Sequence, residues 1–283
     1  MERYSYQIFV PGGNKTALVF GREDDAALRK VIQDKIFAAH EQDEDGEVEQ
    51  VGFVGTDKSL PQLTMAGGEF CGNATRAAAA YYLEGREGKV EIAVSGAPKP
   101  LLAGITPAGE VWAQMPIFED VPAAITSVGD GLFWVDIEGI SHLIVSQTQS
   151  LPLLKAIFDC KIKAGQTGIA FDFLSKIVQE HSLSLDKAYG IIFLENIADV
   201  LKMHPFVHVV ASQTTFYETG CGSGAMCVGL VSSMLRGEGT DISLLQPSGK
   251  IIKAVVEYCG NNDRAKGKIL GDVERGATYE VEV

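Results

Sequence analysis

The chain has 283 residues, of which 46% are hydrophobic and 22% charged, a composition typical of a globular protein with one large domain or two of ordinary size. Its 37 acidic and 24 basic residues give a net charge of −13, which disfavours binding to nucleic acid or to an anionic membrane surface. No stretch approaches the roughly 18 apolar residues of a membrane helix, and the first residues lack the apolar core of a signal peptide, so we expect a cytoplasmic protein.

The first 118 residues alternate between strand and helix patterns. Period-two patterns bounded by glycine and proline predict strands over 4–10, 16–20, 49–55, 62–65, 90–95 and 111–115. An Ala-rich stretch over 71–83, ended by Gly85, predicts a helix. Helical spacing predicts another over 24–39, with the following residues on or near one face: Leu28, Val31, Ile32, Lys35 and Ile36.

The second half repeats this organisation. Strand patterns cover 133–137, 143–146, 189–194, 207–211, 241–245, 251–258 and 279–283. Helical patterns cover 171–181 and 225–235, the latter ended by Gly237. We interpret the acidic run 41–47 as a solvated loop rather than a metal or partner site.

An internal repeat relates the two halves. When Cys71 is set on Cys221, Gly72 meets Gly222 and Arg86 meets Arg236, and after a short insertion Ser-Gly at 95–96 meets Ser-Gly at 248–249. Chance similarity of Ala- and Gly-rich segments is the alternative. Because the offset is close to half the chain length, we favour duplication of a whole domain. We predict domains over 1–118 and 119–264, with the last segment, about 265–283, returning to the first domain.

The two cysteine loops carry the chemistry. Each of Cys71 and Cys221 comes just before a predicted helix, among glycines that let backbone N–H groups approach a ligand closely. A helix N-terminus favours a bound carboxylate and lowers the pKa of a nearby thiol. Inversion at an amino-acid α-carbon needs one group to remove a proton from one face and another to deliver a proton to the opposite face. A thiolate and a thiol can do this, so the pair predicts racemisation or epimerisation.

The remaining candidates are weaker. With five cysteines and no Cys-x-x-Cys pair, we expect reduced thiols, no disulfide framework and no bound metal. Cys160 and Cys227 are interpreted as small hydrophobic residues. The five histidines show no ligand spacing and are expected at surface or satisfied core positions. No nucleotide-binding fingerprint follows a strand, so we expect no cofactor.

The chain resembles the diaminopimelate epimerase superfamily, which shares Cys-Gly-Asn in one half and Cys-Gly-(Ser/Thr)-Gly in the other. The likeness spans nearly the full length and includes Asn14 after Pro-Gly-Gly, Glu-Gln-Val-Gly-Phe at 49–53, both cysteine loops and Gln-Pro-Ser-Gly at 246–249. The resemblance implies an α+β fold of two pseudo-symmetric domains. Each would be a strongly curved, mostly antiparallel sheet around a central helix, with the active site in the cleft between them.

Within that superfamily, the loops resemble the histidine racemases of opine-metallophore biosynthesis. Diaminopimelate epimerases carry an Arg upstream of the second cysteine that binds the distal carboxylate; here Ser212 and Gln213 stand in that stretch, and no arginine does. The resemblance implies that Cys71 and Cys221 are catalytic and that the substrate is an amino acid, histidine being the first choice. It implies substrate contacts from Asn14, Glu49, Gly72, Asn73, Glu218, Gly222 and Ser223.

Other interpretations stay open. Glu49 could be an exposed strand residue, and Glu218 an acid at a helix start. A diaminopimelate epimerase, another superfamily isomerase such as a proline racemase or phenazine-biosynthesis enzyme, a cysteine hydrolase, and a two-lobed amino-acid-binding protein are the alternative functions. The chain could act as a monomer or as a homodimer.

Overall fold

The computed structural model describes residues 2–44, 46–117, 121–186, 188–258 and 265–283. Its helices are α1 (Ala26–His40), α2 (Gly72–Tyr82), α3 (Val121–Ala124), α4 (Gln147–Asp159), α5 (Lys163–His181) and α6 (Gly222–Arg236). The strands of the first half are β1 (Arg3–Pro11), β2 (Thr16–Phe20), β3 (Gln50–Val54), β4 (Gln62–Met65), β5 (Gly88–Val94), β6 (Leu101–Ile105) and β7 (Val111–Met115). The remaining strands are β8 (Ile125–Gly129), β9 (Leu132–Ile137), β10 (Ile140–Val145), β11 (Ala188–Ile197), β12 (Val200–Val209), β13 (Thr214–Tyr217), β14 (Thr240–Leu245), β15 (Ile251–Tyr258), β16 (Ala265–Gly271) and β17 (Val273–Glu282).

The two halves pair their strands in the same order and direction. From β1 to β7, each strand pairs with the next, antiparallel except for the parallel pairs β2–β3 and β4–β5. In the second half, β9, β10, β11, β12, β14, β15 and β16 follow the same sequence of directions, with β10–β11 and β12–β14 parallel. This correspondence confirms the pseudo-symmetric, mostly antiparallel α+β fold and explains the internal repeat of the sequence.

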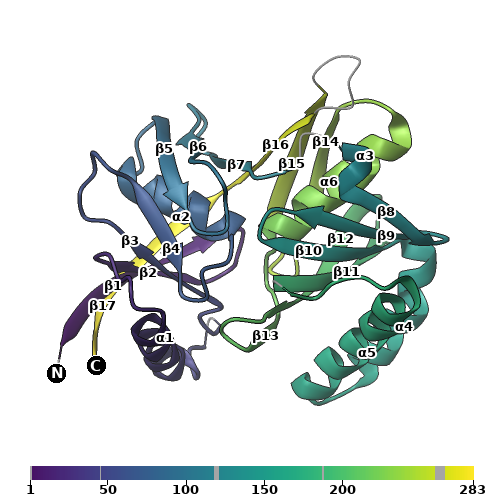
Figure 1. Cartoon of the computed structure of the whole chain (residues 1–283), viewed down its shortest axis with the longest axis horizontal. Coiled ribbons are helices and arrows are strands. Elements are labelled where there is room, and N and C mark those ends of the chain that lie inside the picture. The colour runs from purple at the N-terminus through teal and green to yellow at the C-terminus, as the bar shows by residue number, and fades with distance from the viewer. Residues whose placement is uncertain (1, 45, 118–120, 187, 259–264) are drawn as a thin grey trace.

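A small-residue helix lies inside each curved sheet. Helix α2 contacts all seven strands of the first half, and α6 contacts β9, β10, β14, β15 and β16 (Figure 1). Ten of the eleven residues of α2 are buried, four of them in the run Ala77–Ala80, because small side chains let the strands approach the helix from every side. Helices α1, α4 and α5 lie outside the sheets: α1 covers the first half, and α4 and α5 pack against the outer face of β11 (Figure 1).

The last two strands, β16 and β17, join the second half of the chain to the first. Strand β16 pairs with β15 on one side and with β7 on the other, so equivalent strands of the two halves meet. The chain then continues into β17, which pairs antiparallel with β1 and brings the two termini side by side (Figure 1). The domain boundaries at residues 118 and 264 fall within or beside residues that the structure does not describe, and they stay a prediction.

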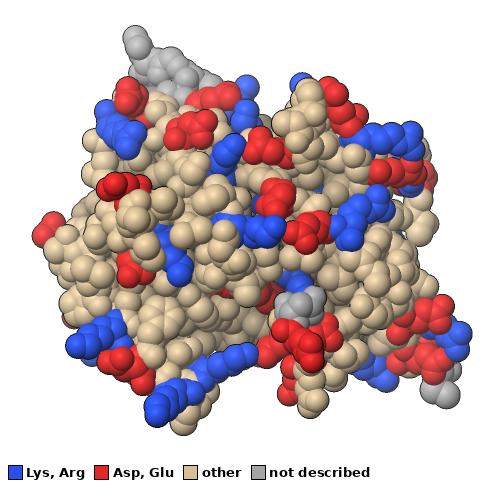
Figure 2. All heavy atoms as spheres, turned by 180° about the vertical axis from the view of Figure 1, so that it is seen from behind, with Lys and Arg blue, Asp and Glu red and all other residues tan. Residues whose placement is uncertain are grey.

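Several element predictions needed correction. Val31 and Lys35 of α1 face solvent, whereas Arg29, Ile32 and Ile36 are buried. The sequence patterns did not predict β6, β8, β13, β16 or α4, and β12 begins seven residues before the predicted strand. On the face drawn in Figure 2, the described basic and acidic side chains are interspersed and do not form a basic patch. Among the described residues, no helix is both long and apolar enough to cross a membrane.

Candidate active site

The two predicted catalytic cysteines occupy the same position at the start of equivalent helices. Cys71 is the N-cap of α2, where its Sγ accepts a hydrogen bond from the Ala74 N–H at 3.4 Å. Cys221 is the N-cap of α6, where its Sγ accepts from the Gly224 N–H at 3.3 Å. Both residues have extended backbone angles, as N-cap residues do. Each sulfur is therefore held at the positive end of a buried helix.

The two cysteine loops touch each other between the helices. The Asn73 side chain donates from Nδ2 to the Gly220 carbonyl at 2.7 Å, which ties the first loop to the second. A Cβ at Gly72 would lie 2.9 Å from Cδ1 of Ile269, and a Cβ at Gly222 would lie 2.5 Å from the same atom. Ile269 thus fills the space between the two helix starts, and glycine at both positions lets the helices approach it.

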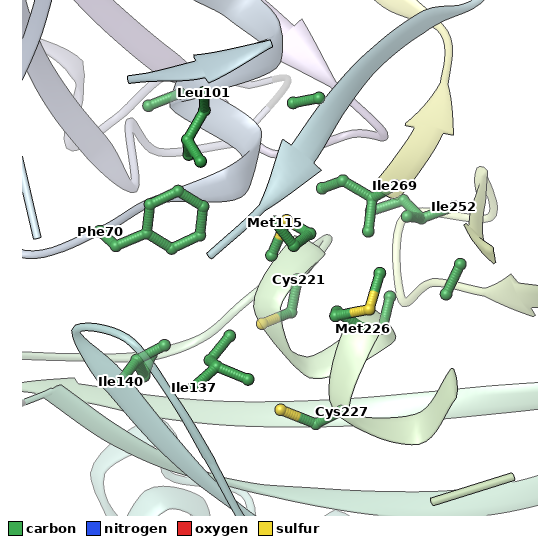
Figure 3. Packing of buried hydrophobic residues seen from close by; sticks show 14 of the residues in the cluster. Phe70, Leu101, Met115, Ile137, Ile140, Cys221, Met226, Cys227, Ile252 and Ile269 are labelled. Carbon is green, nitrogen blue, oxygen red and sulfur yellow. The ribbon is translucent and has the colours of Figure 1, made fainter. Parts of the chain in front are cut away.

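One small cavity is lined by both cysteines. Its volume is about 20 Å³, roughly the room that one water molecule needs. The apolar part of its wall includes Phe70 and Ile140, and Figure 3 shows the Cys221 sulfur on the side of α6 that faces them. The polar part comes mainly from the two loops: Gln50, Glu69, Cys71, Gly72, Asn73, Glu218, Cys221, Gly222 and Ser223. No lysine, arginine or histidine is among the described residues of this wall.

A buried carboxyl group lies against the second thiol. Glu218 shares a hydrogen bond with Cys221 and accepts another from Nε2 of Gln50 at 2.9 Å. Burial raises the pKa of Glu218 to about 7, although the hydrogen bonds from Cys221 and Gln50 oppose the shift. This carboxyl group can therefore gain or lose a proton near neutral pH.

The pKa values of the thiols differ from the sequence-based expectation. Burial raises the pKa of Cys71 and of Cys221 above the usual range, and the nearby Glu218 carboxylate raises both further. The N–H groups of Ala74 and Gly224 lower these pKa values, as expected of helix starts, but their effect is smaller than that of burial. Without a bound cation, both sulfurs are thus thiols at neutral pH.

A hydrogen-bonded chain leads from Cys221 to a buried imidazole. The Ser223 hydroxyl lies 3.5 Å from the Cys221 sulfur and 2.8 Å from Nε2 of His142, which is fully buried on β10. Burial lowers the pKa of His142 to about 3, so its ring is neutral. A Cβ on the neighbouring strand at Gly190 would lie 2.7 Å from Nδ1 of His142, so glycine there makes room for the ring.

Two of the predicted substrate contacts lie outside the cavity between the cysteines. Asn14 is buried and donates from Nδ2 to Glu49 at 2.6 Å. Glu49 also accepts from the N–H and the hydroxyl of Thr219, and burial raises its pKa to about 8. Glu49 lines a separate cavity next to the acidic loop 41–47. Glu49 lies just before β3 and is buried rather than exposed, and its hydrogen bonds hold Thr219 in the segment that precedes Cys221.

Seven of the predicted site residues line one cavity: Cys71, Gly72, Asn73, Glu218, Cys221, Gly222 and Ser223. The other two, Asn14 and Glu49, lie outside its wall, where Glu49 is hydrogen-bonded to Asn14 and to Thr219. Four further residues of the site were not predicted from the sequence: Gln50, Glu69, His142 and Gln246, whose Oε1 accepts from the Cys221 N–H at 3.0 Å. Gln50, Glu69 and Gln246 stood inside the motifs that carried the family resemblance, which was the available signal. His142 had none. No group of three His, Cys, Asp or Glu side chains that could hold a metal occurs in the described part of the chain.

Comparison with known proteins agrees with this arrangement. The family model described as histidine racemase CntK N-terminal domain matches residues 5–280. A histidine racemase of Staphylococcus aureus (strain Mu50) is 23% identical over 254 residues, which cover 86% of this chain and 85% of that protein.

Solved structures at lower identity share the fold. A PhzF-family phenazine biosynthesis protein of Bacillus anthracis has a TM-score of 0.66 at 11% identity, with both chains fully covered. A hydroxyproline epimerase of Agrobacterium vitis has a TM-score of 0.61 at 12% identity, covering 99% of this chain and 92% of that one. Because the family model spans almost the whole length, the chain belongs to the histidine racemase CntK N-terminal domain family and is an isomerase of the racemase and epimerase class.

Proposed function

We propose that this protein racemises free histidine by a two-base mechanism in which Cys71 and Cys221 act on opposite faces of the α-carbon. The observation that carries the proposal is the placement of both thiols as N-caps of equivalent helices in the wall of one cavity. A single thiol beside glycines is ordinarily a packing residue. Two thiols in matched positions of a duplicated fold are the arrangement that stereoinversion needs.

The reaction uses groups that the chain itself supplies. The thiolate of one cysteine removes the α-proton and becomes a thiol, while the thiol of the other delivers its proton to the opposite face and becomes the thiolate. The negative charge of the carbanion spreads onto the substrate carboxylate, which N–H groups at the starts of α2 and α6 can stabilise. The proposal requires no cofactor. The thiols must stay reduced, so we propose the cytoplasm as the compartment.

A bound cation can generate the thiolate. Both thiols have raised pKa values, and Glu218 contributes to the shift in each. An α-ammonium group placed beside Glu218 would oppose that effect and favour ionisation of one thiol. Histidine is favoured as substrate by the relative named above and by the absence of a carboxylate-binding arginine from the described cavity wall.

The direct test is the optical rotation of single L-amino acids incubated with the reduced, chelator-treated protein. We expect the rotation of L-histidine to decay to zero, and Cys71→Ala and Cys221→Ala each to slow the decay by at least about a hundredfold. No decay with any amino acid would refute racemisation. Loss of activity in only one of the two cysteine variants would instead favour a single nucleophile, as in a cysteine hydrolase.

A further inference from the structure

Glu69 has a place in the cavity wall that the two-base mechanism does not use. It lies two residues before Cys71 and lines the cavity that holds both cysteines. It also lines a second cavity of about 260 Å³, whose wall contains Gly67, Gly68 and Asp186. Glu69 thus separates the reacting centre from a larger space beyond it.

One oxygen of this carboxyl group has no partner. Glu69 is partly exposed as a residue, but its Oε2 is fully buried and accepts no hydrogen bond from any described residue. Glycine at position 67 makes room for the group, since a Cβ there would lie 2.6 Å from Oε2. Burial raises the pKa of Glu69 to about 7, and the backbone N–H groups of Glu69 itself and of Gly67, together with the charge of Arg29, oppose the shift. A buried acceptor without a donor is costly, so a ligand that brings an N–H to this position would be favoured.

The charges of the cavity indicate which donor that is. The wall contains two carboxyl groups, Glu69 and Glu218, and no basic side chain among its described residues. An amino acid brings one α-ammonium group, for which Glu218 lies beside Cys221, while its carboxylate is matched by the helix N-termini. The charge of Arg29 acts on Glu69 from outside this wall and lowers its pKa, but no described basic side chain lines the cavity itself. A hydrogen-bond donor that reaches Glu69 from within the cavity would therefore come from the side chain of the substrate. Asn73 Oδ1 is another buried acceptor without a described partner in the same wall.

We propose that Glu69 is the specificity-determining residue of this site and accepts a hydrogen bond from a side-chain N–H of the substrate. This inference rests on the proposed function and names the class of substrate that the site selects: amino acids whose side chain carries an N–H donor or a positive charge, such as imidazole. A site with a buried polar group discriminates strongly against an analogue that leaves the group unpaired.

The test compares L-histidine with L-β-(2-thienyl)alanine, whose ring has nearly the same shape but no N–H. We would measure kcat and KM for α-proton exchange with both compounds in the wild type, Glu69→Gln and Glu69→Ala, with Glu91→Gln on the exposed face of β5 as the matched control. The wild type and Glu91→Gln should prefer histidine by at least about a hundredfold in kcat/KM. In the Glu69 variants the preference should fall at least about tenfold, mainly through a higher KM for histidine.

The outcomes separate the two proposals. If the wild type exchanges the α-proton of histidine and the Glu69 variants keep the full preference, the assignment of Glu69 is wrong and the racemase proposal stands. If the wild type exchanges the α-proton of no amino acid, the racemase proposal fails. The role of Glu69 is then tested by the Kd of L-histidine, measured by calorimetry, and equal Kd values in wild type and Glu69→Gln would overturn that role. Circular dichroism checks that each variant folds. Glu69→Gln keeps nearly the same side-chain volume, so a loss of preference in this variant cannot be attributed to the altered packing that Glu69→Ala introduces.

Discussion

At the scale of single residues, the site is set by thiols and carboxyl groups that share a buried space. Glu218 is hydrogen-bonded to Cys221, and its charge acts on Cys71 as well. Burial and the charge of Glu218 keep both thiols protonated in the free site at neutral pH, whereas Glu218 itself, with a pKa of about 7, can gain or lose a proton there. The site is therefore adapted to a ligand that brings positive charge, which allows a proton to leave when the substrate arrives.

The buried Glu218 also makes stability depend on pH. Its pKa is raised from 4.5 to about 7 in the folded protein. Between these values the unfolded chain loses this proton and the folded protein keeps it, so the free energy of unfolding falls as pH rises through this range and is constant above it. Glu218→Gln removes this effect, and its stability relative to the wild type should rise by up to about 3 kcal/mol between pH 5 and pH 8.

Urea unfolding of wild type, Glu218→Gln and the exposed control Glu91→Gln at both pH values would measure this change. The control should follow the wild type. A difference between wild type and Glu218→Gln that stays constant with pH would show that Glu218 is already ionised in the folded protein at pH 5, contrary to its burial.

At the scale of elements, glycines hold the cysteine loops in place. Gly96, just after β5, has a φ of +73°, and a Cβ there would lie 2.3 Å from the backbone nitrogen of Phe70. Gly109, in the turn between β6 and β7, has a φ of +84° with nothing within 4 Å of a Cβ. The two positions share the left-handed conformation and differ in whether they touch the first cysteine loop.

This pair gives a matched test of the loop position. Gly109→Ala should lower the free energy of unfolding by about 1 kcal/mol and leave kcat unchanged, because only the backbone conformation is strained. Gly96→Ala should cost at least about 2 kcal/mol more and lower kcat at least about tenfold, because Phe70 and Cys71 must move. Equal stability and activity in the two variants would mean that the loop tolerates displacement.

The sequence predicted the elements that carry regular patterns and missed those that lack them. Helix α2 and strand β3 were predicted closely because their small-residue and alternating patterns are strong. Helix α4 was missed because Pro152 lies inside it, and a proline within a stretch ordinarily argues against a continuous helix. Strand β6 contains Gly104, which weakens a strand pattern but lets the indole of Trp112 pack against the backbone.

The site could be predicted where function leaves a local signature. Both cysteines stand in short motifs, so their position in one cavity followed from the repeat. His142 and Ser223 are 81 residues apart in sequence and meet only because β10 passes beside the start of α6. The oxygens of Glu49 accept hydrogen bonds from Thr219, a contact that the sequence did not reveal, and its contact with the substrate stays a prediction. Residues that act through such long-range contacts leave no pattern that one sequence can reveal.

At the scale of the whole molecule, duplication explains how one cavity obtained two thiols at matched positions. Each half contributes one curved sheet, one central helix and one N-cap thiol, and the β7–β16 pair joins the halves. The cavity that both cysteines line has a volume of only about 20 Å³, so we expect the two halves to separate when an amino acid enters and to close around its α-carbon.

The central claim is that Cys71 and Cys221 work on opposite faces of one carbon, and isotope labelling in D₂O tests it most directly. L-Histidine would be incubated with the wild type, and both enantiomers analysed by mass spectrometry during the first few per cent of conversion. The delivering thiol has exchanged with solvent, so D-histidine should carry one deuterium at the α-carbon while the remaining L-histidine carries none. Deuterium in the remaining L-histidine, or D-histidine that keeps its original proton, would show a single base acting on both faces and would contradict the account.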